Sequence, residues 1–461
     1  MTNTTRRNFI ALTGAALLTT ACATGGPSRT ELPPIVFVHG NGDSASIWQS
    51  TLWRFESNGW PRTRLHAIEL PYPLARDDDS KPQPGRTSTA EHMAYLSAEV
   101  DRMLQSTGAQ KVVLVGNSRG GNAIRNYIQN GGGAAKVSHA ILGGVPNHGV
   151  WNVPGRAPDN EFAGNGPFLR ALNAPKDAAG NEVAGPVRWL TIRSDNNDKY
   201  AQPDGQWLGK KGVATGIGYD GPELKGATNV VLPRVDHRET AFSPAAFAAA
   251  YRFITGRAPA TLEVLPEQRV TLAGKVTGLG LSSTDPASGS FANNLPLPGA
   301  LLRIFVIDAG TALRERPTPV YETTVGADGR WGPFAATEGT RYEFVISAPG
   351  YATTHIYRSP FPRSSDLVNM RPERVPAADQ SAPSLVILTR PRGYLDPTRD
   401  KMSFDGQSPP PGALPGAGVA SSRIKPEGPQ RTVVAEFNGE RVVGRSWPMA
   451  GNEVAVLELT Y

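Results

Sequence analysis

The chain has almost no cysteine: Cys22 is the only one among 461 residues. A disulfide needs two cysteines, so an internal disulfide framework is excluded and the fold has to depend on packing. A chain this long can bury sizeable cores, but a single core stops growing beyond roughly 300 residues. We therefore expect two or three domains.

Long runs of like charge are also absent. Lys and Arg number 47 and Asp and Glu 41, giving a net charge of +6, and the basic residues are spread thinly. This distribution excludes the basic stripe that is typical of nucleic-acid binding, so we expect no nucleic-acid partner. The acidic run at residues 77–79 lies in a polar loop that bears prolines, and one run supplies too few ligands for a metal site. We expect neither a metal ion nor a cofactor.

The apolar stretch at residues 10–21 is too short to span a bilayer stably. It follows Arg6 and Arg7 and ends in small residues, which is typical of a twin-arginine export signal. We predict that residues 1–23 are this signal. The protein is then expected to be periplasmic, an outer-membrane lipoprotein or secreted.

Cys22 allows two interpretations of how the signal is processed. Residues 18–22 resemble a lipobox, although Thr19 stands where that motif usually has leucine. Lipidation of Cys22 would tether the protein to a membrane. Alternatively, residues 21–23 form an A-x-A cleavage site, and the cysteine is removed. Both interpretations stay open.

Short apolar runs alternate with helical spacing over the next part of the chain. The candidate strands are residues 35–38, 65–70, 112–115, 137–142, 187–192 and 230–232. Such alternation predicts the α/β class, a doubly wound and mostly parallel sheet with helices on both faces. We place this domain at residues 34–257. Residues 146–185 are polar but carry scattered large apolar side chains, so we expect a cap or lid there.

The composition changes after residue 256. Residues 269–277 alternate strictly between apolar and polar, and further short strand patterns follow between Pro-Gly and Asp-Gly turns. These patterns predict an all-β, sandwich-like domain at residues 262–375. Residues 380–461 are also rich in strand patterns, and form either a third unit or the completion of the second domain.

One pentapeptide suggests a nucleophile. Gly116-Asn117-Ser118-Arg119-Gly120 is a G-x-S-x-G sequence at the end of an apolar strand and at the start of a helix. On such a turn the serine hydroxyl is exposed above the edge of the sheet. The N–H of Arg119, at the start of the helix, is a candidate donor to an oxyanion. The Arg119 side chain places a cation at a helix N-terminus, which is mildly unfavourable, and the sequence shows no partner for it.

A serine nucleophile needs a base, and the base needs an acid to orient it. In doubly wound hydrolases these follow the serine in the order acid, then histidine. His237 follows the last candidate strand of the α/β part and is the expected base. Asp195 and Asp198 both follow the preceding strand and are the alternative acids.

The region from about residue 34 to residue 256 resembles secreted α/β-hydrolase lipases and esterases. The resemblance implies Asp198 as the acid, because residues 198–203 match the Asp-x-x-x-Gln-Pro ending of many lipase acid loops. It implies the N–H of Asn41 as the second oxyanion donor, through the HG-x-G sequence at residues 39–42. His39 and His148 are expected to be structural.

These residues together predict an exported carboxylic ester hydrolase that works through an acyl-enzyme, with an ester or lipid as substrate. A polyester depolymerase of the polyhydroxyalkanoate type is an alternative, since export and a β module suit a polymer. A non-catalytic surface binding protein is an alternative of another class. The β region is expected to contact a membrane surface or polymer, or to act as a spacer, and the sequence leaves the oligomeric state open.

Overall fold

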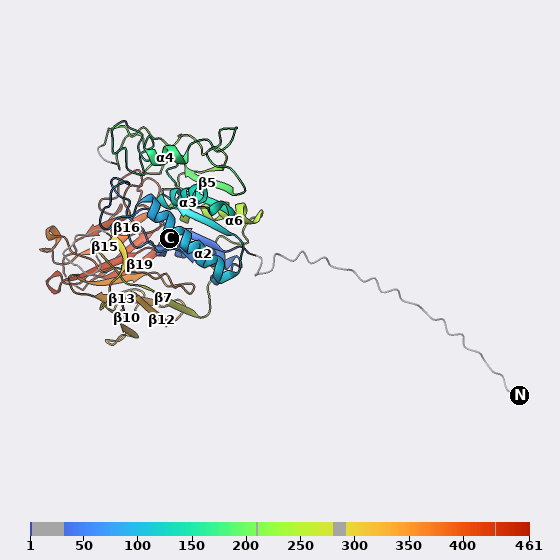
Figure 1. Cartoon of the computed structure of the whole chain (residues 1–461). Helices are drawn as coiled ribbons and strands as arrows, with labels where there is room; N and C mark the ends of the chain where they lie inside the picture. The colour runs from blue at the N-terminus through green and yellow to red at the C-terminus, as the bar shows by residue number, and fades with distance from the viewer. Residues whose placement is uncertain (2–31, 209–210, 280–291, 429) are drawn as a thin grey trace. The chain divides into compact units, whose positions relative to one another are not determined.

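The computed structural model describes residue 1 and residues 32–208, 211–279, 292–428 and 430–461 (Figure 1). Residues 33–461 form one compact unit. Arg6, Arg7 and Cys22 of the expected export signal lie outside the described residues.

The first half of the compact unit is built on a parallel sheet with the order β2-β1-β3-β4-β5-β6. Its strands are β1 (Ile35–Val38), β2 (Leu65–Ala67), β3 (Val112–Asn117), β4 (Val137–Gly143), β5 (Arg188–Ser194) and β6 (Thr228–Leu232). Every residue of β1 and β3 is buried, as expected for parallel strands that are covered on both faces. This confirms the α/β fold class.

The helices of this half are α1 (Gln49–Ser57), α2 (Thr89–Thr107), α3 (Arg119–Asn130), α4 (Pro167–Leu172), α5 (Glu239–Phe242) and α6 (Pro244–Thr255). α2 begins at a capping box formed by Ser88 and Glu91 and ends at Gly108, whose φ of 67° is left-handed. α6 begins at Ser243, whose side chain accepts a hydrogen bond from the N–H of Ala246. Short 3₁₀ helices lie at Ala45–Trp48, Arg62–Arg64, Gly133–Ala135, Ala377–Asp379 and Met449–Gly451.

Successive residues of β1 point to opposite faces of the sheet. Val36 and Val38 pack with α2 and α3, in a core that also contains Leu96 and Ile124. Phe37 packs instead against Trp48, Phe55 and, through Phe55, Phe247 of α6. The helices therefore cover both faces, and the carboxyl ends of β3, β4 and β5 are left to carry loops.

The second half is all β (Figure 1). Its strands are β7 (Val270–Lys275), β8 (Thr277–Leu279), β9 (Ala292–Pro296), β10 (Leu301–Ile307), β11 (Tyr321–Thr324), β12 (Arg330–Ala336), β13 (Arg341–Ser347), β14 (Thr353–Arg358), β15 (Val386–Thr389), β16 (Met402–Phe404), β17 (Ser421–Ile424), β18 (Thr432–Phe437), β19 (Glu440–Arg445) and β20 (Glu453–Glu458). The largest sheet has the order β11-β10-β13-β14-β20-β15-β17, and smaller sheets pair β12 with β7, β8 with β9, and β18 with β16 and β19.

Residues 380–461, the C-terminal tail, share the largest sheet with the preceding residues. β20 lies parallel to β14 on one side and to β15 on the other. Of the tail's strands, β15, β17 and β20 thus continue a sheet that β10, β13 and β14 begin, while β16, β18 and β19 form a small sheet of their own. Because β20 lies between β14 and β15, this sheet depends on the end of the described chain.

Two further properties of the described residues bear on function. None of their helices combines the length and the apolar composition that crossing a membrane requires. Their His, Cys, Asp and Glu side chains also form no group of three or more that is placed to hold a metal ion.

Candidate active site

Ser118 sits at the turn between β3 and α3. Its φ of 53° and ψ of −126° lie outside the regions that a non-glycine residue favours, which costs on the order of 1–3 kcal/mol. Two backbone hydrogen bonds hold this conformation, from Ser118 N to Gly143 O at 3.0 Å and from Gly121 N to Ser118 O at 3.0 Å. The serine is half-buried, so the strained turn presents it at the sheet edge.

The glycines on each side of Ser118 are required by close packing. A Cβ at Gly120 would lie 2.4 Å from the carbonyl oxygen of Val38, and a Cβ at Gly116 would lie 2.7 Å from Ile124 Cδ1. A backbone carbonyl cannot yield as a flexible side chain can. The elbow therefore tolerates only glycine at position 120 without a shift of β1.

His237 and Asp198 form a close buried pair. His237 Nδ1 lies 2.9 Å from both carboxylate oxygens of Asp198. Nε2 of the same ring is buried and has no hydrogen-bond partner among the described residues. Asn117, next to the nucleophile, donates from Nδ2 to the carbonyl oxygen of His237 at 3.4 Å. The loop that carries the histidine thus lies against the serine elbow, with one ring nitrogen engaged and the other open.

Asp195, the alternative acid, is placed differently. It is exposed, and its Oδ1 accepts a hydrogen bond from the backbone N–H of Arg234 at 2.8 Å. It connects the loop after β5 to the loop after β6, while Asp198 is the carboxylate that faces His237.

The loop after β1 lies directly against Ser118. A Cβ at Gly40 would be 3.2 Å from Ser118 Cβ. His39 braces this loop, since its Nε2 accepts a hydrogen bond from Leu70 N at 3.2 Å and its Nδ1 lies 3.0 Å from Gly40 O. The Asn41 side chain is engaged as well, accepting from Ala75 N at 2.7 Å. The Asn41 side-chain oxygen thus connects the loop after β1 to the segment that follows β2.

Arg119 has a partner that the sequence did not reveal. Its guanidinium is 1% exposed and donates from Nε and Nη2 to the two carboxylate oxygens of Glu161, both at 2.8 Å. It also donates to the carbonyl oxygens of Pro73 and Thr87. Glu161 belongs to the expected cap at residues 146–185. The side chain therefore ties the segment at residues 146–185 to the elbow, while the backbone N–H of Arg119 stays at the start of α3.

His148 is held by the cap. Its Nε2 lies 2.9 Å from Glu182 Oε1, and Glu182 Oε2 accepts a hydrogen bond from Lys225 N. Glu182 thus connects His148 to the segment that follows β5.

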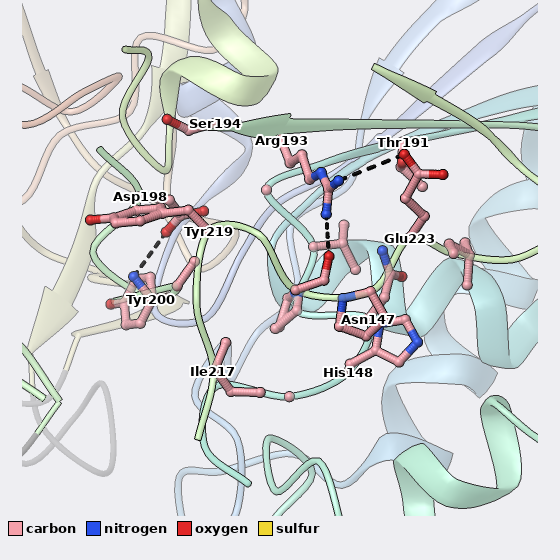
Figure 2. Close-up of a pocket in the computed structure, with 18 of the residues that line it drawn as sticks. Asn147, His148, Thr191, Arg193, Ser194, Asp198, Tyr200, Ile217, Tyr219 and Glu223 are labelled. Carbon is pink, nitrogen blue, oxygen red and sulfur yellow. Dashed lines mark hydrogen bonds and ion pairs between the residues drawn. The ribbon is translucent and has the colours of Figure 1, made fainter. Parts of the chain in front are cut away.

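A cavity of about 140 Å³ opens beside Asp198, at the carboxyl ends of β4 and β5 (Figure 2). Asp198 and Tyr219 lie at one end of it and Arg193, Glu223 and His148 at the other. Ser118 is not among the described residues that line it. The cavity thus adjoins Asp198 rather than Ser118, and it is smaller than the roughly 300 Å³ of a typical ligand pocket.

Charged and aromatic side chains surround the acid–histidine pair. The ring of Tyr200 contacts that of His237 edge to face, with centroids 4.5 Å apart. Lys199 is largely buried, and burial and the charge of Arg238 lower its pKa to about 8. Arg238 donates to Asp43 Oδ1 at 2.6 Å, which connects the base loop to the loop after β1.

The C-terminal tail also contacts these loops, which sequence reasoning missed. Arg390, Tyr394 and Arg399 each bind the carboxylate of Asp236, the residue before His237. These partners are more than 150 positions apart in the chain, so no local pattern signals them.

Two parts of the chain match known protein families. Residues 33–219 match the family of the α/β-hydrolase fold, and residues 268–375 match the lipase C-terminal domain. Among solved structures, the chain is similar to Bacillus licheniformis lipase BlEst2 in its mature form, with 20% identity, 48% of this chain and 92% of that chain covered, and a TM-score of 0.35.

Two further solved structures are similar to about half of the chain. Aspergillus fumigatus lipase B is 15% identical, with 50% of this chain and 54% of that chain covered and a TM-score of 0.34. The esterase RhEst1 from Rhodococcus sp. ECU1013 is 15% identical, with 50% and 92% covered and a TM-score of 0.29. The parallel sheet therefore lies in the part of the chain that matches the α/β-hydrolase fold, and the β region contains the part that matches the lipase C-terminal domain.

Proposed function

We propose that the protein is an exported serine hydrolase that cleaves carboxylic esters through an acyl-enzyme, with Ser118, His237 and Asp198 as its triad. The observation that carries the proposal is the pairing of His237 Nδ1 with Asp198 at 2.9 Å while Nε2 stays open beside the serine elbow. A base of this kind needs one nitrogen fixed by an acid and the other free to take a proton.

In the proposed reaction Ser118 Oγ attacks the ester carbonyl and His237 Nε2 takes the serine proton. The proton then passes to the leaving alcohol, and the carbonyl re-forms as an acyl-serine. Water, deprotonated by the same nitrogen, attacks the acyl carbonyl. The bond from the acyl carbon to Ser118 Oγ then breaks, His237 returns the proton to Ser118 Oγ, and the acid leaves. Asp198 keeps the imidazole in the required tautomer and stabilises the imidazolium that forms.

The negative charge on the tetrahedral intermediate needs donors that are already in place. We assign these to the backbone N–H groups of Asn41 and Arg119. His39 braces the loop that carries Asn41, which lies against Ser118. Glu161 binds the side chain of Arg119, the first residue of α3. Both supports are buried, so the donors need little reorganisation when charge develops.

The match of residues 268–375 to a lipase C-terminal domain supports a lipid ester as the substrate class. The apolar and polar mixture around the cavity beside Asp198 suits a small group at one end of such a substrate. Turnover of emulsified triglyceride, measured against a soluble short-chain ester and a polyester film, would separate a lipase from an esterase and from a depolymerase.

Substitution of the nucleophile tests the assignment directly. Ser118→Ala is expected to lower kcat on p-nitrophenyl esters by about three to six orders of magnitude, because no acyl-enzyme can form. Asp198→Asn is expected to lose about 10⁴-fold through the wrong tautomer, and Asp195→Asn to keep full activity. Ser118→Ala with retained turnover, or Asp195→Asn with the loss expected of Asp198→Asn, would contradict the proposed triad.

We also propose export by the twin-arginine route, supported by Arg6 and Arg7 ahead of the apolar stretch at residues 10–21. Replacing both arginines by lysine is expected to leave the protein in the cytoplasmic fraction. Metabolic labelling with a fatty acid, compared between wild type and Cys22→Ser, decides between lipidation of Cys22 and cleavage after residue 23.

A further inference from the structure

We infer that the C-terminal tail is a working part of the active site: Arg390, Tyr394 and Arg399 position the two loops that carry His237 and Asp198. These three are positioning residues, since they act through the loops and not on the substrate. The inference rests on the proposed triad.

The base loop is held first through Asp236. This carboxylate is fully buried and directly precedes His237. It accepts hydrogen bonds from Tyr394 N at 2.7 Å, from Arg390 Nη1 at 3.1 Å and from Arg399 Nη2 at 3.3 Å. Its other oxygen accepts from the backbone N–H groups of Arg238 and Glu239. Asp236 thus joins the turn that contains His237 to the tail.

The same two arginines hold a second carboxylate of this turn. The Glu239 carboxylate accepts hydrogen bonds from Arg390 Nη2 and Arg399 Nη1, both at 2.6 Å. Burial and the neighbouring charge of Asp236 raise the pKa of Glu239 above its ordinary value. Two buried carboxylates this close repel each other, so the turn depends on cations supplied from elsewhere in the chain.

Tyr394 spans the base loop and the acid loop. Its ring lies 4.4 Å from the ammonium of Lys199 and 5.1 Å from the guanidinium of Arg238. Lys199 follows Asp198, and Arg238 follows His237. One aromatic ring from the tail is therefore placed between the neighbours of the two residues that must stay paired.

A second segment of the tail holds the acid loop. Lys199 Nζ donates to Gly418 O at 3.0 Å, and Gln202 Nε2 donates to Gly416 O at 3.2 Å. The ring of Trp207 packs so closely on Gly418 that a Cβ there would lie 2.0 Å from it. The acid loop thus rests on the tail along its length after Asp198.

Active-site loops need this kind of support, because a displacement of about 1 Å in a catalytic group can cost about 100-fold in rate. Within the hydrolase half, His237 is fixed at its backbone by Thr240 Oγ1 and Asn117 Nδ2. The negative charges of Asp236 and Glu239 are balanced by Arg390 and Arg399 of the tail. Loss of those cations is expected to displace the turn that carries His237.

The test compares Arg390→Gln and Arg399→Gln with Arg392→Gln in the full-length enzyme. Arg392 is the matched control: it is buried at 5% exposure and crosses the same boundary, but binds Ser46 O, Gln49 Oε1 and Thr460 O instead of either loop. For each variant kcat and KM are measured on a soluble p-nitrophenyl ester, with thermal unfolding followed by circular dichroism. The proton on His237 Nδ1 is observed by NMR, assigned with His237→Ala.

Arg390→Gln and Arg399→Gln are expected to lower kcat by about 100-fold with KM within about threefold, and to lose the Nδ1 proton resonance. Arg392→Gln is expected to keep both. If Arg390→Gln does not fold, the test rests on the Arg399 variants, because Arg399 is partly exposed. Arg399→Lys is expected to recover only part of kcat, since an ammonium group cannot make the two parallel hydrogen bonds of a guanidinium. Folded Arg390→Gln and Arg399→Gln with wild-type kcat, or an equal loss in Arg392→Gln, would overturn the inference. Wild-type turnover that does not depend on Ser118 would instead overturn the triad, and the NMR signal would still report on the tail.

Discussion

At the scale of single residues, Arg119 shows how one buried contact changes the meaning of a motif. A cation at a helix N-terminus costs about 0.3–1 kcal/mol through the helix dipole. The bidentate contact with Glu161 and two backbone carbonyls offsets that cost. Glu161 lies 42 positions further along the chain. No local sequence pattern could therefore predict Glu161 as the partner of Arg119, although the G-x-S-x-G motif did predict the elbow.

His92 gives a prediction at the same scale. Its side chain is buried, and its Nε2 has no partner among the described residues. Burial, followed by the charges of Arg119 and His39, lowers the pKa of His92 well below 6.5. The unfolded chain then binds a proton below about pH 6.5 that the folded chain does not bind. Stability is therefore lost as the pH falls below that value and is complete above it.

Below about pH 6.5, one such histidine changes the free energy of unfolding by about 1.4 kcal/mol per pH unit. His92→Asn is expected to remove this contribution to the pH dependence, as measured by urea unfolding at pH 5.0, 5.5, 6.0 and 7.5. His139, whose pKa is also lowered by burial, stays in both proteins and leaves a common background. An unchanged pH dependence in His92→Asn would show that His92 is not the group that titrates.

At the scale of elements, the segment at residues 146–185, the expected cap, is held to α3 by the Arg119–Glu161 pair. Removing one partner of a buried pair leaves an uncompensated charge, which costs about 3–5 kcal/mol. Glu161→Gln is therefore expected to lower the free energy of unfolding by that amount. The matched control is Asp101→Asn, whose pair with Lys136 is exposed, with an expected cost below about 1 kcal/mol. Equal and small effects of both substitutions in urea unfolding would contradict the role of the pair.

Elements with local signals could be predicted from the sequence. α2 has its capping box, α6 has Ser243 followed by proline, and β3 is a continuous apolar run. Strands such as β12 and β17 carry weaker signals: β12 is interrupted by Gly332 and Pro333, and β17 alternates exposed and buried residues over four positions. The position of β20, parallel between β14 and β15, is set by pairing across about 100 residues. Such non-local pairing leaves no periodic signature in one strand.

The candidate site divides in the same way. Ser118 and His237 follow strands, so their place at the sheet edge could be inferred from chain order. Which of Asp195 and Asp198 faces the histidine depends on the course of one loop, and only a family resemblance distinguished them. The contacts of Arg390 and Arg399 with Asp236 could not be predicted from the sequence, because tertiary packing alone brings these residues together.

At the scale of the whole molecule, the hydrolase half and the β region share a core. Trp53 of α1 is 2% exposed and belongs to the hydrophobic cluster formed by β7, β10, β12 and β13. Its indole N–H donates to Ser364 O at 2.9 Å, and Gln49 of the same helix donates to Ser365 Oγ at 2.9 Å. One side of α1 therefore packs on the parallel sheet and another on the β region.

A shared core has a consequence for unfolding. If the β region opened first, it would expose Trp53 and remove the cations from Asp236 and Glu239, so the hydrolase half would lose stability at the same moment. We expect one calorimetric transition for residues 33–461, with equal calorimetric and van't Hoff enthalpies.

Trp53→Ala is expected to lower the free energy of unfolding by about 3–5 kcal/mol and to lower the temperature of that single transition without splitting it. Leu265→Ala, at a residue 47% exposed beside the same boundary, is the control and should leave the transition in place. Two separate transitions in the wild type would mean that the halves fold independently, and esterase activity would then survive unfolding of the β region. A single transition at which activity and β structure disappear together would instead mean that the β region is required for the catalytic loops to hold their places.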